Sequence, residues 1–379
     1  MRSSARSSVL LLLVLSVLSA CTKKKNENEI LLGSYSSNTG ATATFGQFQL
    51  NGLKMAIEEI NAKGGINGKL IKHINYDNKS DNDETLAVVN RLISQDGVVA
   101  ILGEATSGRS KIGAQVAQQN KIPMLTSSAT NPEVTKIGNY IFRACFIDPF
   151  QGTVMAQFMT GTLKMKRAAV MRDIKNDYSV GLSDIFIEKL KEAGGEVVVD
   201  LSYQEGDIDF KSQLTSIKAK NVEAIFVPGY YNEVALIAKQ ARELGMKQPL
   251  LGGDGWSSPK LYEIAKDALN GSYFSNHYTT ESTDPKTVEF VKAYKAKHNE
   301  EPDVMAALAY DSVYFMAEAI KNAKEVTPEN IREELTKIKD FHGVTGKMSM
   351  NENRDAVKSA VVVEIQGPVY KYVTTVNPQ

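Results

Sequence analysis

The stretch at residues 103–132 reads GEATSGRSKIGAQVAQQNKIPMLTSSATNP, and it decides the class of fold. An apolar run at 98–102 leads into the small polar cluster Thr106–Ser107–Gly108. A helical pattern follows, and a second short apolar run at 122–125 ends in the hydroxyl-rich cluster at 126–130. This order predicts a strand, a helix and a second strand, with a polar loop after each strand.

The two polar loops are expected to lie side by side. In a parallel α/β sheet the carboxyl ends of neighbouring strands meet at one edge, where ligands bind. The first loop also begins a helix, whose free N–H groups and positive dipole end attract anions. Ser107, Ser128 and Thr130 are therefore a candidate cradle for a small anion such as a carboxylate. Each of them alone is more typical of a helix cap than of a binding site, so the prediction depends on the two clusters together.

The same alternation of strands and helices runs through most of the chain. It predicts parallel sheets with right-handed crossovers, hence an α/β fold. The alternation restarts after Pro149, so the second half repeats the architecture of the first, and two similar lobes are expected to face each other across a cleft. Strands are expected at 29–36, 70–76, 98–102, 122–125, 167–171, 196–202, 224–227 and 249–251, and a less regular C-terminal part adds helices at 285–297, 303–323 and 328–338 and strands at 346–350, 359–363 and 369–373.

The second lobe offers its own candidates at the ends of predicted strands. Asp254, in the sequence Gly-Gly-Asp-Gly, could hold an ammonium group through a charge-assisted hydrogen bond. Tyr178 and Tyr230 would add aromatic faces that pack over a ligand. Together with the hydroxyls of the first lobe, these residues predict a receptor for a zwitterion. Asp254 is also a typical turn residue, and Tyr230 could belong to the start of a helix.

Composition excludes several other classes of function. The 379 residues hold 44 basic and 44 acidic side chains, and without Arg2 and Arg6 of the leader described below 42 remain against 44, a net charge of −2. No basic stripe is present for nucleic acid. The four histidines are scattered, so no metal site is expected. Since no nucleophile–base pair and no phosphate-binding loop stands out, we expect neither an enzyme nor a cofactor.

The N-terminus reads as an export signal. Arg2 and Arg6 precede an apolar run at 9–18 that is too short to span a bilayer. The sequence Leu-Ser-Ala-Cys that ends at Cys21 resembles the bacterial lipobox, in which the cysteine becomes the lipidated first residue. We therefore expect a lipoprotein signal peptide at 1–20 and a tether at 21–29, with the mature protein anchored by lipid in the cell envelope. Cys145, in an apolar segment, is expected to be a buried small hydrophobe.

Several separated motifs, taken together, resemble a known family. They are Asn51–Gly52 with the following AIEEIN, GGING at 64–68, Tyr76–Asp77, SATNP at 128–132 and Gly229–Tyr230–Tyr231. They are similar to those of type I periplasmic binding proteins of the leucine/isoleucine/valine-binding kind, over roughly residues 30–372. The resemblance implies two Rossmann-like lobes joined by a three-segment hinge near Ile147, His277 and Asn351. The implied bounds are 30–147 with 278–351 for the first lobe and 148–277 with 352–379 for the second.

The resemblance also implies roles for individual residues. Ser107 and Thr130 fall where the family binds the ligand carboxylate, and Ser128 falls where a backbone carbonyl helps to hold the ammonium. Ala129 lies in the same loop and is included among the expected ligand-binding residues. In the second lobe, Tyr178 and Tyr230 fall on the aromatic positions that close over the ligand. Two further residues depart from the family pattern: Asp254 falls where the family places a longer Glu, and Phe45 replaces a larger aromatic at the side-chain pocket. Ser80 and Thr106 fall where enteric members carry a disulfide.

These observations together predict a non-enzymatic receptor for a small amino acid. It is expected to be the extracytoplasmic substrate-binding component of an ABC importer, with leucine, isoleucine or valine as the favoured ligand. Its partners would be the permease subunits and, through the lipid, the membrane, and it is expected to be a monomer. Two alternatives stay open at this point: a sensor of the same fold that feeds a signalling partner, and a different ligand, such as another amino acid, an amide or a small carboxylate.

Overall fold

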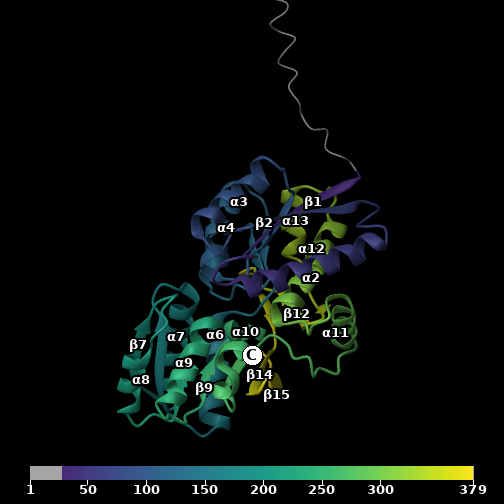
Figure 1. Ribbon diagram of the computed structural model, residues 1–379. Helices are drawn as coiled ribbons and strands as arrows, with labels where there is room; N and C mark the ends of the chain where they lie inside the picture. The colour runs from purple at the N-terminus through teal and green to yellow at the C-terminus, as the bar shows by residue number, and fades with distance from the viewer. Residues whose placement is uncertain (1–27, 379) are drawn as a thin grey trace, which may run out of the picture.

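A computed structural model of the chain describes residues 28–378 and contains two α/β lobes (Figure 1), as the sequence predicts. The expected leader and Cys21 lie outside the described residues. The sheet of the first lobe is parallel throughout, with the order β2-β1-β3-β4-β5. Its strands are β1 (Glu29–Ser36), β2 (Leu70–Asp77), β3 (Ala100–Gly103), β4 (Met124–Thr126) and β5 (Ile141–Arg143), and its helices are α2 (Ala43–Ala62), α3 (Asn82–Ser94), α4 (Ser107–Gln119) and α5 (Glu133–Lys136).

The second lobe is built on a seven-stranded sheet with the order β15-β14-β10-β9-β8-β6-β7. The strands β6 to β10 pair in parallel, and β14 and β15 add an antiparallel edge. The strands are β6 (Arg167–Asp173), β7 (Glu196–Tyr203), β8 (Ala224–Phe226), β9 (Leu250–Gly252), β10 (Tyr273–Asn276), β14 (Ala360–Gln366) and β15 (Val369–Val376). The helices are α6 (Asp148–Gln157), which continues into a π-helical turn (Phe158–Thr162), α7 (Asp177–Glu192), α8 (Lys211–Lys218), α9 (Tyr231–Glu243) and α10 (Pro259–Ala265).

The C-terminal segment returns to the first lobe before it ends in the second. Helix α12 (Val304–Asn322) packs along α2, and both lie beside the first sheet in Figure 1. The close approach of these two helices requires Gly52, because a Cβ there would lie 2.1 Å from the Ala306 carbonyl oxygen. The remaining elements of this segment are α11 (Pro285–His298), α13 (Pro328–Leu335) and a small antiparallel sheet of β11 (Phe341–Gly343), β12 (Gly346–Met350) and β13 (Ala356–Lys358).

Strand pairing shows where the chain passes between the sheets. β13 still pairs with β12, whereas β14 pairs with β10 of the second lobe. The third passage therefore lies between Lys358 and Ala360, later in the chain than the Asn351 expected from the resemblance. The lobe bounds as a whole stay a prediction.

The elements that the sequence analysis did not assign are short. They are α5, β5, α10, β10, β11 and β13. Strand β10 spans Tyr273–Asn276 and is held between β9 and β14, which lie far from one another in the sequence. A segment this short carries too few residues for a periodic pattern, so tertiary pairing rather than local sequence determines it.

Candidate functional site

One small cavity lies between the two lobes, and most of the predicted site residues line it. It holds about 220 Å³ of empty space, part of it open to solvent. The first lobe contributes Phe45, Ala105, Ser107, Ser128, Thr130 and Met305, and the second contributes Tyr178, Tyr230, Asp254 and Gly255.

The structure thus brings together every predicted site residue that it describes except Ala129. Ala129 is fully buried, its N–H donates to Thr126 Oγ1, and its carbonyl accepts from the side chain of Arg143. Its backbone N–H and carbonyl are therefore hydrogen-bonded within the protein, and Ala129 does not line the cavity. Its contact with a ligand stays a prediction. The ligand roles of the other residues stay a prediction.

Three cavity residues were missed by the sequence analysis. Ala105 and Gly255 adjoin predicted positions and carry no polar group, and only their neighbours in the sequence could have indicated them. Met305 reaches the cavity from the first turn of α12, a helix that was predicted but whose contact with the site gives no local signal. All three add apolar surface to the cavity.

The hydroxyl groups of the first lobe lie where the sheet topology predicts. Strands β3 and β4 are parallel neighbours, so the loops after them meet at one edge. Ser107 is the first residue of α4, and its Oγ accepts a hydrogen bond of 3.2 Å from the Asn131 N–H of the other loop. Ser128 Oγ donates to the Ala105 carbonyl at 3.2 Å. The helix start presents N–H groups without intrahelical partners, which favour an anion here.

Asp254 is the single carboxylate on the cavity wall, and it is held from two sides. The Tyr178 hydroxyl donates to Oδ1 at 3.0 Å and itself accepts from the Gly255 N–H at 3.2 Å. His277 Nε2 lies 3.1 Å from Oδ2. Burial lowers the pKa of His277 to about 4 against the opposing effect of Asp254, so the imidazole is neutral at pH 7 and donates through Nε2. A buried carboxylate fixed in this way favours a positively charged group on the ligand.

Behind Asp254 a second carboxyl group is buried. Asp148 begins α6, and its Oδ1 accepts from Gln151 Nε2 at 2.8 Å. Gln151 Oε1 in turn lies 3.4 Å from the Asp254 N–H. Burial, reinforced by the charge of Asp254, raises the pKa of Asp148 to about 7, although hydrogen bonds from Thr130 and Gln151 oppose the shift. The Asp148 N–H also donates to the Thr130 carbonyl at 3.0 Å, which links this group to the first lobe.

Aromatic side chains from both lobes close the cavity. Tyr178 and Tyr230 stack with their ring centroids 5.4 Å apart, and Phe45 meets Tyr230 edge-on at 5.5 Å. Burial raises the pKa of both tyrosines, so their hydroxyls remain protonated donors. Tyr178 is only 2% exposed and Asp254 3% exposed. The lobes are therefore closed over the cavity.

Contacts outside the cavity hold the lobes in this closed arrangement. The Tyr231 hydroxyl donates to the Ala41 carbonyl at 3.1 Å, and Lys111 forms an ion pair with Asp177 at 3.0 Å. Asn131 Nδ2 also donates to the Asp177 carbonyl at 2.8 Å. Each of these contacts joins a residue of the first sheet's lobe to one of the second.

Other kinds of site find little support in the described part of the chain. Among residues 28–378 no group of three or more His, Cys, Asp or Glu side chains could hold a metal ion. Across the same residues no helix is both long and apolar enough to cross a bilayer. Cys145 is buried and free, as predicted, and burial raises the pKa of its thiol.

Comparisons with known proteins agree with the fold. The model of a family described as periplasmic binding protein matches residues 29–368. The leucine-, isoleucine-, valine-, threonine- and alanine-binding protein of Pseudomonas aeruginosa is 31% identical over 318 residues, which are 84% of this chain and 84% of that protein. The solved structure of a leucine-binding protein, LivK, from Thermotoga maritima is 38% identical with a TM-score of 0.89, over 92% of this chain and 99% of that one. The branched-chain amino acid transporter substrate-binding protein LivJ from Streptococcus pneumoniae, solved in complex with isoleucine, is 36% identical with a TM-score of 0.87, over 92% and 100% of the two chains.

Proposed function

This chain belongs to the periplasmic binding protein family, and from that premise we propose that it is the substrate-binding component of an ABC importer for branched-chain amino acids. The observation that carries the proposal is the shared cavity: Asp254 of one lobe and the hydroxyls of Ser107, Ser128 and Thr130 of the other line the same buried space. A free amino acid presents an ammonium group and a carboxylate at one end, and the two walls match these two charges.

The rest of the cavity supports a small aliphatic side chain. Phe45, Ala105 and Met305 add apolar surface, and the empty space is small. Such a wall favours leucine, isoleucine or valine over charged amino acids, whose side chains would be buried without a partner. Relatives that bear the names of leucine- and isoleucine-binding proteins support the same ligand class.

Under this proposal the protein binds and delivers its ligand without chemical change. Binding closes the lobes, and the closed form docks on the permease subunits. An extracytoplasmic location follows from the family, and we infer that lipid on Cys21 anchors the chain to the membrane as a monomer. The lipobox-like sequence before Cys21 supports that anchor.

A thermal-shift screen tests the ligand. Residues 28–379 are heated with each standard amino acid, and leucine, isoleucine and valine are expected to raise the melting temperature with the logarithm of their concentration. Two leucine analogues are the matched controls: the amide, which lacks the carboxylate, and 4-methylpentanoate, which lacks the ammonium. Both are expected to bind far more weakly, because each leaves buried polar groups unpaired. An equal shift with 4-methylpentanoate would remove the role of Asp254.

A further inference from the structure

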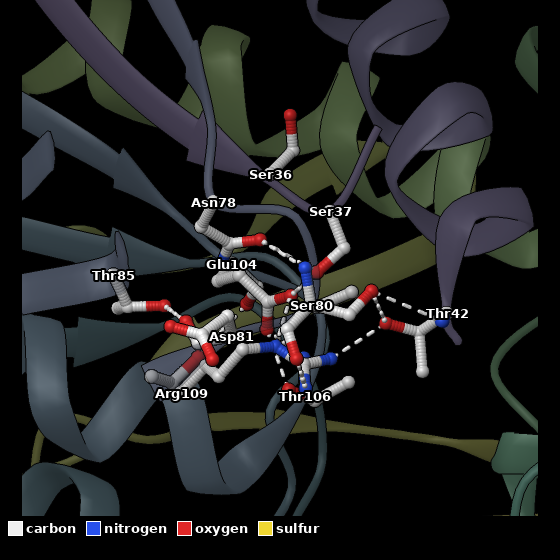
Figure 2. A network of polar contacts seen from close by, with 12 residues as sticks. Ser36, Ser37, Thr42, Asn78, Ser80, Asp81, Thr85, Glu104, Thr106 and Arg109 are labelled. Atoms are coloured by element: carbon white, nitrogen blue, oxygen red, sulfur yellow. Dashed lines mark hydrogen bonds and ion pairs between the residues drawn. The ribbon is translucent and has the colours of Figure 1, made fainter. Parts of the chain in front are cut away.

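A buried polar network lies behind the cavity wall of the first lobe (Figure 2) and has no part in the ligand contacts described above. At its centre are Glu104, which is fully buried, and Arg109, which is 7% exposed. Arg109 Nε donates to Glu104 Oε1 at 3.1 Å. Taking two charges out of water is costly, so a buried pair of this kind needs further hydrogen bonds to be maintained.

The Glu104 side of the network fixes the loop that leads into Ser107. Glu104 Oε2 accepts from both the N–H and the hydroxyl of Thr106, the latter at 2.6 Å, and Thr106 directly precedes the helix that starts at Ser107. The Glu104 carbonyl accepts from Thr126 Oγ1 at 2.8 Å, in the strand before the second cavity loop. One residue thus ties both hydroxyl-bearing loops together.

The Arg109 side reaches the segment that carries Phe45. Arg109 Nη2 donates to Thr42 Oγ1 at 2.6 Å, and Thr42 directly precedes α2, where Phe45 lies in the first turn. Arg109 Nη1 approaches the Ser80 carbonyl at 3.4 Å, and Ser80 Oγ in turn accepts from the Thr42 N–H at 3.1 Å. The planar guanidinium therefore connects three separate loops at fixed directions, which a lysine ammonium on a flexible stem cannot do.

The network also connects the two positions at which enteric members of the family carry a disulfide. Ser80 and Thr106, expected to lack a disulfide, are instead joined through Arg109 and Glu104. Arg109 further acts on the opposite lobe, because its positive charge lowers the pKa of the Tyr230 hydroxyl against the larger effect of burial. Tyr230 is the residue that meets Phe45 across the cavity.

We propose that Arg109 is a positioning residue for ligand binding, which sets Phe45 and Ser107 at the spacing that the ligand and Tyr230 require although it does not itself line the cavity. The inference rests on the proposed amino acid binding. A binding site whose walls are held in place before the ligand arrives loses less free energy to ordering, so weakening the network reduces affinity.

The decisive variant is Arg109→Lys in the full chain. Lysine keeps a positive charge beside Glu104 but cannot contact Thr42, Ser80 and Glu104 together, so leucine affinity by calorimetry is expected to fall about tenfold, for the loss of charge-assisted hydrogen bonds. The matched control is Arg172→Lys, since Arg172 also pairs with carboxylate groups, those of Asp184 and Asp200, but away from the cavity. That variant is expected to bind leucine like the wild type.

A second pair of variants separates positioning from folding. Thr42→Val removes the hydroxyl that Arg109 Nη2 contacts and leaves the Glu104–Arg109 pair in place, whereas Thr42→Ser retains the hydroxyl. We expect leucine affinity to fall several-fold for valine and to be restored for serine. The loss of affinity for valine is expected to exceed what any decrease in the urea unfolding midpoint of the ligand-free variant explains.

These experiments distinguish a positioning role of Arg109 from a role in folding alone. Wild-type affinity in both Arg109→Lys and Thr42→Val would overturn the proposal, as would affinity losses that merely follow the unfolding midpoint. If Arg109→Lys fails to fold, the valine–serine difference at position 42 decides the matter. A wild-type protein and an Arg172→Lys control that bind no amino acid would instead overturn the proposed function.

Discussion

Asp254 Oδ2 lies 3.1 Å from His277 Nε2, and the His277 ring stacks on Phe146 with the ring centroids 3.6 Å apart. Phe146 and His277 belong to two different passages between the lobes, because one adjoins α6 and the other follows β10. The carboxylate that we expect to receive the ligand ammonium is thus connected to the segments about which the lobes would turn.

The first prediction concerns this carboxylate. Asp254→Asn keeps the size of the side chain but removes its charge, so the affinity for leucine is expected to fall at least about tenfold, because a buried ammonium loses its counter-charge. Isothermal titration calorimetry measures the change. Asp200→Asn is the control, since Asp200 pairs with Arg172 of its own lobe, away from the cavity. Equal leucine affinity in Asp254→Asn and the wild type would show that Asp254 does not hold the ammonium.

The second prediction concerns the closed state. Tyr231→Phe removes a hydroxyl that donates to the Ala41 carbonyl across the lobes but does not line the cavity. The closed form is expected to be less favoured, so leucine should dissociate about two- to fivefold faster, the effect of roughly one hydrogen bond. Stopped-flow measurements with excess competitor give the rate. An unchanged rate would mean that this contact does not help to hold the lobes together.

The third prediction follows from the lowered pKa of His277. Its folded-state pKa is about 4 and the ordinary value is 6.5, with burial as the main cause and Lys358 adding to it. Below pH 6.5 the unfolded chain takes up a proton that the folded chain does not, so stability falls as the pH drops from about 6.5 to about 4. His277→Gln should remove on the order of 3 kcal/mol of this decline, as measured by urea unfolding across the pH range.

A second histidine provides the matched comparison. Burial also lowers the pKa of His73 to about 4, and its ring lies at Ser34 Oγ rather than at the cavity. His73→Gln should change the pH dependence of stability in the same direction but leave leucine affinity unchanged, whereas His277→Gln should weaken binding. The same affinity in both variants would contradict the link between His277 and Asp254.

The fourth prediction concerns Asp148, for which the pH dependence of stability has the opposite sign. The pKa of Asp148 is raised from 3.8 to about 7, so the folded state retains a proton that the unfolded state releases above pH 3.8. Stability is therefore lost as the pH rises from about 4 to about 7. Asp148→Asn, which mimics the protonated group, should be more stable than the wild type at pH 8, by a few kcal/mol at most, and similar to it at pH 4. Parallel curves for the two proteins would exclude a buried proton on Asp148.

The fifth prediction concerns the membrane anchor. Cys21→Ser removes the only thiol at the expected lipidation position, so the protein should move from the membrane fraction to the soluble extracytoplasmic fraction. Immunoblots of the separated fractions measure the change, with Cys145→Ser as the control. Retention of Cys21→Ser in the membrane fraction would show that another feature holds the protein there.

The sequence predicts the parts of the fold that depend on local pattern. The strand at 29–36 and the two hydroxyl loops follow from apolar runs and the polar clusters after them, and parallel pairing then places Ser107 beside Asn131. Met305 could not be found in this way, because its place in the cavity depends on how α12 packs against α2. The position of Ala129 outside the cavity lining has a related cause: the turn of its loop, which local sequence does not specify, directs its carbonyl toward Arg143.

The buried network shows a similar limit. Glu104 and Arg109 lie within the stretch at 103–132 that decides the fold, but nothing in their spacing indicates that both side chains are buried. Their partners Thr42 and Ser80 lie in loops far away in the sequence. Only the assembled lobe reveals that these four side chains meet.

The near-complete burial of Tyr178 and Asp254 has a kinetic consequence. A ligand enclosed by these side chains cannot be displaced directly by a competitor, because a competitor molecule cannot contact the bound ligand. Exchange must wait for the two halves to swing apart, so the rate at which a bound guest leaves should not depend on how much competitor is added. The transporter would then receive the ligand only after the two lobes of the receptor have separated.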